Sequence, residues 1–174
     1  METRDWVRLV LSGFVILAIQ VLVINNLNLN QYMFPQLYIL LLITLPINLK
    51  HWVGYLIAFA LGFAVDSFSY TPGLQSFTAV SVMFLRYVYF NNLVDKEWLS
   101  TGVRPSFTSV DSGWFVAYVG IFTLVFHTIL FFLENFSFTH LGSTLLKILY
   151  SSSLAIFLIL LFTFTFNRET TNDS

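Results

Sequence analysis

Four ionisable side chains stand within otherwise apolar runs of this chain: Asp66, Arg86, His127 and Glu134. Ionisable residues at membrane depth usually face protein or a water-filled cavity. His127 and Glu134 are seven residues apart in HTILFFLE, so on a helix they would share one face. Such a pair could relay a proton, because histidine titrates near neutral pH. The simpler interpretation is a neutral His127 hydrogen-bonded to a neighbouring helix, with Glu134 in contact with water near the end of its own helix.

Asp66 ends the apolar stretch GYLIAFALGFAVD, in which Gly54, Ala58, Gly62 and Asp66 recur at every fourth position. Small residues at this spacing let a second helix backbone approach closely. The stretch therefore predicts a helix-packing seam, with the Asp66 carboxylate accepting backbone N–H groups of the turn that follows. The seam could meet another helix of this chain or a partner subunit. The alternative is that small residues are merely common in membrane helices and that Asp66 lies at the interface with water.

Arg86 is placed about two-thirds of the way along its apolar run. Its guanidinium could reach the lipid headgroups or pair with backbone carbonyls. A direct bridge to Asp66 is not expected, because the two residues lie toward opposite sides of the membrane. The chain contains no metalloprotease, nucleophile-elbow or phosphate-binding motif, and its three histidines show no metal-ligand spacing. We therefore expect neither an enzyme nor a bound cofactor or metal.

The elements that must position these residues are membrane helices. Hydrophobic residues make up 57% of the chain, charged residues only 10%, and the mean hydropathy is +0.78. Soluble domains carry about 25% charged residues. We expect an all-α integral membrane protein, a single domain over residues 1–174 that forms a compact bundle of six transmembrane helices. Pro35 and Pro46 fall near the ends of the second helix and are not expected to break it. The helices are expected at residues 7–24, 32–49, 52–68, 74–94, 114–133 and 144–166.

Lys and Arg residues gather on one side of this six-helix arrangement. Cytoplasmic loops of membrane proteins carry such an excess, so both termini and the long connection at residues 95–113 are expected in the cytoplasm. Lys147 is the exception, because it falls near the other side. The residues that set the orientation are Arg4, Arg8, Lys50, Lys96, Arg104 and Arg168.

The string GFAVDSFSYTPGLQSFTAVSVMFLR, from Gly62 to Arg86, resembles the central signature of the MreD family of rod shape-determining membrane proteins. Gly62, Phe63 and Asp66 match its first part and Gly73 its second, and a helix with small residues follows. The segments FLRYVYF, GWFVAY and HTILFFLENFSF are similar to the form found in Bacteroidota. The number of helices agrees over essentially the whole chain.

This resemblance implies a non-enzymatic scaffold subunit of the machinery that synthesises peptidoglycan during cell elongation. The chain would lie in the lipid of the bacterial inner membrane beside MreC. Together they would link the MreB filament to RodA and its transpeptidase partner. No nucleic-acid partner is expected.

The MreD family is also thought to share its six-helix plan with the S components of energy-coupling-factor transporters. The alternative function is therefore a small-solute-binding transporter subunit. It predicts a pocket near the outer face, built from the Asn-rich loop and Asp66, and a docking stripe of small residues on the first helix. Ser12, Gly13 and Ala18 do not form the four-residue small pair that this stripe requires.

Overall fold

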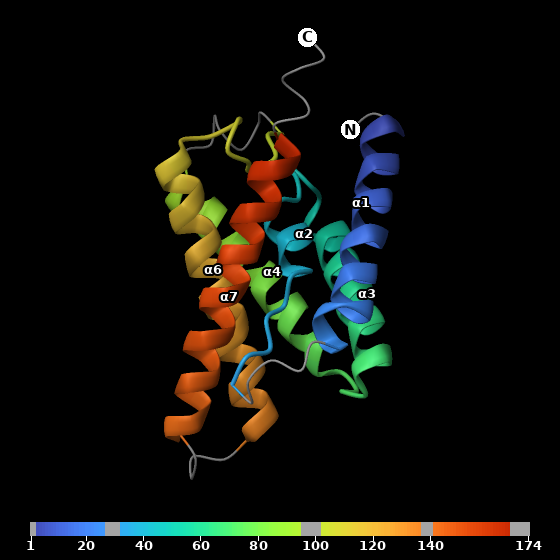
Figure 1. Cartoon of the computed structure of the whole chain (residues 1–174). Helices are drawn as coiled ribbons and strands as arrows, with labels where there is room; N and C mark the ends of the chain where they lie inside the picture. Colours follow the sequence, from blue (N-terminus) through green and yellow to red (C-terminus); the bar gives the residue numbers. More distant parts are fainter. Residues whose placement is uncertain (1–2, 27–31, 95–101, 137–140, 168–174) are drawn as a thin grey trace.

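A computed structural model describes residues 3–26, 32–94, 102–136 and 141–167, together with the side chains of those from residue 10 to residue 165 (Figure 1). This part of the chain contains six α-helices and one 3₁₀ turn, and it has no strand. The elements are α1 (Thr3–Leu22), η1 (Ile24–Asn26), α2 (Ile39–Ile43), α3 (His51–Ser69), α4 (Leu74–Leu93), α6 (Ser112–Asn135) and α7 (Leu141–Asn167).

Five of these helices are long, and they confirm five of the six expected runs to within a few residues. Helices α3, α6 and α7 are both long and apolar enough to cross a membrane, which is typical of a multi-pass membrane protein. Helices α1 and α4 each have 20 residues, which at 1.5 Å per residue corresponds to about 30 Å, the thickness of a bilayer core. The helices pack in a series in which α1 contacts α3, α3 contacts α4, α4 contacts α6 and α6 contacts α7.

The prediction of a second long helix at residues 32–49 is wrong. Only Ile39–Ile43 is helical there, and the rest of the run consists of turns, bends and irregular chain. Pro35 and Pro46 explain the break, because proline lacks an N–H donor and pushes the residue before it away from helical geometry. We call residues 32–47 of this run the central segment. In Figure 1 it passes through the middle of the bundle, with α2 near its upper end.

The central segment is enclosed by protein. Residues 35–43 and 45–47 are buried, and Tyr38, Ile39, Leu42, Ile43 and Leu45 have no exposed surface. Irregular backbone at membrane depth is tolerated only where protein or a water-filled cavity surrounds it. The long helices therefore form a wall around a segment that could not face lipid.

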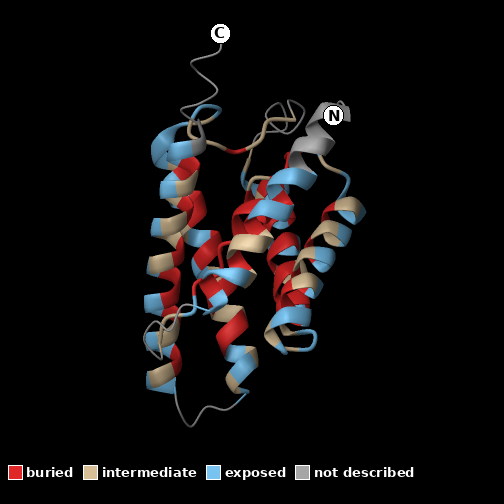
Figure 2. Cartoon of the chain, turned by 45° about the vertical axis from the view of Figure 1, so that its right-hand side comes forward, coloured by how far each residue is buried: buried red, intermediate tan, exposed pale blue. Residues whose placement is uncertain are grey.

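The long helices bury one face and expose the other (Figure 2), and many of the exposed side chains are large and apolar. Large apolar side chains on the outside are more than half exposed, which would be costly in water over so much of the surface but is the ordinary arrangement in lipid. Examples from different helices are Phe14, Phe63, Phe77, Leu149 and Phe157.

Candidate functional site

The small residues of α3 face α4 of the same chain. A Cβ atom added to Gly62 would come within 2.5 Å of Ser76 Cα and 2.7 Å of Ser76 N, and one added to Gly54 would come within 2.5 Å of Met83 Cε. Ala58, between them, is completely buried. The seam therefore serves the α3–α4 contact, and in this structure it is not open to a partner subunit.

Asp66 ends this seam by capping α4. Its Oδ1 accepts from the backbone N–H of Gln75 at 2.9 Å, and its Oδ2 accepts from the backbone N–H of Ser76 at 2.9 Å. The hydroxyls of Ser76 and Thr71 donate to the same carboxylate at 2.6 and 2.9 Å. Asp66 was expected to accept backbone N–H groups of the turn that follows α3, but the backbone donors are Gln75 and Ser76, which lie beyond that turn. The N–H groups are those of the first turn of α4, where the helix dipole also favours a negative charge.

The residue at the N-cap position of α4 explains why a carboxylate from another helix is needed. This residue is Gly73, with φ 82° and no side chain that could cap the helix. The positive φ is readily adopted by glycine and allows the tight turn from α3 into α4. Asp66 supplies from α3 the acceptor that a Ser or Asp at the N-cap position would otherwise provide.

Arg86 is completely buried and binds the end of the central segment. Its Nε donates to the Tyr118 hydroxyl at 2.8 Å, its Nη2 donates to the Leu45 carbonyl, and its guanidinium lies 5.0 Å from the centre of the Phe90 ring. Tyr118 in turn donates to the Ile43 carbonyl at 2.9 Å. Of the two interpretations of Arg86, pairing with carbonyls is confirmed and extension to the headgroups is wrong. The two carbonyls lie at or just beyond the C-terminus of α2, where a helix favours positive charge.

His127 binds the beginning of the central segment. Its Nδ1 lies 2.8 Å from the Thr123 carbonyl, and its Nε2 accepts from the Gln36 backbone N–H at 3.4 Å. A neutral imidazole with its proton on Nδ1 satisfies both contacts. Glu134 is not part of this arrangement, because its side chain is 43% exposed and lies 3.5 Å from Lys147. No hydrogen bond joins His127 to Glu134 among the described residues.

Sequence reasoning missed two polar residues of this group. Gln20 of α1, completely buried, accepts from the Leu37 N–H at 2.6 Å and donates to the Pro35 carbonyl at 3.3 Å. Ser151 of α7 accepts from the Phe34 N–H at 2.9 Å and donates to the Tyr32 carbonyl at 3.1 Å. The signal for Gln20 was its position as a single polar residue within AIQVLVI.

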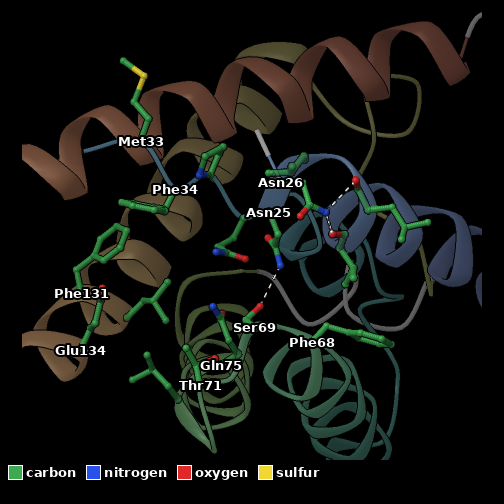
Figure 3. A pocket seen from close by; sticks show the side chains of 17 residues that line it. Asn25, Asn26, Met33, Phe34, Phe68, Ser69, Thr71, Gln75, Phe131 and Glu134 are labelled. Atoms are coloured by element: carbon green, nitrogen blue, oxygen red, sulfur yellow. Dashed lines mark hydrogen bonds between the residues drawn. The ribbon is translucent and has the colours of Figure 1, made fainter. Parts of the chain in front are cut away.

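A cavity of about 680 Å³ opens at the end of the bundle where η1, the α3–α4 turn and the C-terminal part of α6 meet (Figure 3). In Figure 3, Phe34, Phe131 and Glu134 lie on one side of it and Asn25 and Asn26 on the other. Asp66 does not line the cavity, whereas Asn25 and Asn26 of the Asn-rich loop do, and residues 27–31 of that loop lie outside the described residues. The polar residues that line it are Asn25, Asn26, Gln36, Ser69, Thr71, Gln75 and Glu134.

The described residues contain no group of three His, Asp or Glu side chains that could hold a metal ion. Comparisons with known protein families, curated proteins and solved structures found no significant match for this chain.

Proposed function

We propose that this chain is a non-enzymatic scaffold subunit of the cell-elongation machinery in the bacterial inner membrane. Its partners would be MreC, RodA and the transpeptidase partner of RodA, with an indirect link to MreB. The resemblance of Gly62–Arg86 to the MreD signature is the origin of the proposal. The structure adds a physical reason for that pattern, since Gly62, Asp66 and Gly73 together form the joint between α3 and α4.

One observation carries the non-enzymatic part of the proposal. The three deeply buried ionisable residues, Asp66, Arg86 and His127, are each engaged with backbone groups of this chain. A catalytic group must be free to contact a substrate. What the protein presents outward is a broad apolar surface, as a subunit that assembles with other membrane helices would.

The transporter alternative finds less support in α1. Gly13, the glycine of that helix, is buried, and an added Cβ would lie 3.9 Å from Leu41 Cδ1 of the central segment. It faces inward and is not presented to a docking subunit.

The test is an affinity pull-down of the tagged full-length chain from its native host in a mild detergent, with quantitative mass spectrometry of proteins and small molecules. The expected result is enrichment of MreC and the RodA complex over a tagged control membrane protein of similar size. Recovery of transporter ATPase subunits in place of MreC and the RodA complex would overturn the scaffold role.

A further inference from the structure

The cavity beside η1 has the size and the lining of a ligand site. Its volume of about 680 Å³ falls within the range of about 300–1,000 Å³ typical of small-molecule pockets. Apolar side chains line it together with a few polar groups from separate elements, which is the usual composition of such sites. The scaffold role makes no use of this cavity.

Two buried glutamines point to the kind of ligand. Gln36 is 7% exposed and Gln75 4% exposed, and both line the cavity. Gln36 Oε1 accepts from Gln20 Nε2 at 3.1 Å, and Gln75 Oε1 accepts from the Tyr38 hydroxyl at 3.0 Å. Each oxygen is thus engaged inside the protein. Neither amide nitrogen donates to any residue in the part of the chain that the structure describes.

The hydrogen bonds around Gln20 fix which way the Gln36 amide faces. The Leu37 N–H donates to Gln20 Oε1, so the atom of the Gln20 amide that faces away from Leu37 is the nitrogen of its NH₂ group. That NH₂ group lies 2.8 Å from Asn25 Oδ1, 3.1 Å from Gln36 Oε1 and 3.3 Å from the Pro35 carbonyl, so each of these groups presents an oxygen to it. The Gln36 amide nitrogen therefore has no hydrogen-bond acceptor among the described residues. This nitrogen reaches the open space of the cavity, so its acceptor comes from outside the described chain, as water or as a polar group of a ligand.

The charge of the lining restricts the ligand further. No Lys or Arg lines the cavity, and its one charged side chain is the carboxylate of Glu134. The Glu134 carboxylate is paired with Lys147 Nζ at 3.5 Å. Lys147 Nζ also lies 5.4 Å and 5.8 Å from the centres of the Phe34 and Phe131 rings, so this wall is close to neutral and favours neither an anion nor a cation. Phe34 and Phe131 give the same cavity an apolar wall beside the amide donors.

We propose that this cavity binds an uncharged polar group that carries hydrogen-bond acceptors next to an apolar portion, with Gln36 and Gln75 as the donors. Carbonyl, amide and hydroxyl groups have this chemistry. A soluble small molecule could bring such a group, and so could the sugar headgroup of a neutral glycolipid. The proposal goes beyond the scaffold function and does not depend on the outcome of the pull-down.

The first arm of the test uses soluble probes and the full-length chain in nanodiscs of phosphatidylcholine. Benzamide, benzoate and benzylammonium share one ring and differ in charge, and their binding is measured by saturation-transfer NMR. Benzamide is expected to bind in preference to benzoate. Gln36→Glu and Gln75→Glu keep the internal acceptor and remove the donor, so each should weaken benzamide binding at least tenfold. Asn92→Asp, the same type of change on the exposed surface of α4, should leave binding unchanged.

The second arm tests the lipid source. Nanodiscs that also contain monogalactosyldiacylglycerol are analysed by native mass spectrometry, and retention of this glycolipid with displacement of benzamide would assign the site to a lipid headgroup. If the glutamate variants fail to fold, Leu22→Trp serves instead. The Leu22 side chain is exposed and lines the cavity, so a larger side chain at this position should block the cavity sterically. Equal binding of benzoate and benzamide, no binding of either probe type, or binding that survives Leu22→Trp would overturn the proposal.

Discussion

Asp66, Arg86 and His127 each bind backbone groups of this chain, and none of these three residues binds another of the three. Asp66 accepts N–H groups of α4, Arg86 donates to a carbonyl of the central segment, and His127 accepts an N–H group from the same segment. Inside a membrane no water is available to satisfy such groups, and each one left unpaired costs several kcal/mol. At the scale of single residues, each of these buried ionisable side chains therefore marks a backbone group that would otherwise have no hydrogen-bond partner.

Substitution of Asp66 should destabilise the protein in a graded way. Asp66→Leu removes every acceptor and leaves the Gln75 and Ser76 N–H groups unpaired, at about 1–3 kcal/mol each. Asp66→Asn keeps one oxygen but turns an NH₂ group toward a donor, so its effect should be intermediate. The melting temperature in detergent, followed by size-exclusion chromatography after heating, measures both.

Asp111→Asn is the matched control for the Asp66 substitutions. Asp111 caps α6 through the Trp114 N–H at 2.9 Å, but it is exposed. Water can replace the lost acceptor there, so the melting temperature should fall by less than it does for Asp66→Asn. Equal effects of the two amide substitutions would show that burial of the Asp66 cap is unimportant.

Gly62→Ala should be strongly destabilising despite its small size. The new Cβ would lie 2.5–2.8 Å from backbone atoms of Gln75 and Ser76, which cannot turn away as a side chain can. Helices α3 and α4 would have to separate, at a cost of about 1–3 kcal/mol or more. Gly120→Ala is the control, because an added Cβ at Gly120 on α6 meets nothing within 4 Å. The ratio of folded to aggregated protein after purification should fall for the first variant only, and a normal yield of Gly62→Ala would contradict the close α3–α4 contact.

At the scale of elements, four helices supply the side chains that satisfy one broken segment. Gln20 comes from α1, Arg86 from α4, His127 and Tyr118 from α6, and Ser151 from α7. This arrangement ties helices distant in sequence to the same central backbone. The bundle is therefore held together by polar contacts at its axis as well as by apolar packing.

The run of three serines in α7 offers a direct test of this role. Ser151→Ala leaves the Phe34 N–H and the Tyr32 carbonyl without their partner, so it should lower stability by about 1–3 kcal/mol. Ser153→Ala, two residues later on the exposed face, should change stability by no more than about 0.5 kcal/mol. Thermal melting of both variants in the same detergent measures the difference, and two equal melting temperatures would contradict the role of Ser151.

Hydrophobicity and small-residue spacing were enough to place the long helices and the α3–α4 seam. The residues Gly54 to Asp66 carry that information locally, because the spacing of four and the acid at its end both lie within one helix. The central segment could not be placed in this way. Its apolar composition matches that of a membrane helix, and only the pair Pro35 and Pro46 indicated that the helix is broken. Gln20 and Arg86 bind backbone groups that are free only because the helix is broken, so these contacts could be identified only from the structure.

At the scale of the whole molecule, the central segment completes the crossing pattern. Helix α1 begins and α7 ends at the same end of the bundle (Figure 1). Five long helices alone would put these two points at opposite ends, so the irregular segment between η1 and α3 must supply one more passage through the bundle. The predicted cytoplasmic placement of both termini requires this sixth crossing.

Single cysteines can test the sixth crossing, because the chain contains none of its own. Asn26 and Asn48 are exposed and bracket the central segment, while Pro72 and Thr108 are exposed and bracket α4. An impermeant maleimide added to spheroplasts should label Asn26→Cys and Pro72→Cys at once, and Asn48→Cys and Thr108→Cys only after the membrane is permeabilised. The reverse pattern would invert the orientation that Lys and Arg predict. Labelling of Asn26→Cys and Asn48→Cys from the same side would mean that the central segment turns back within the membrane, and the six-crossing arrangement would then be wrong.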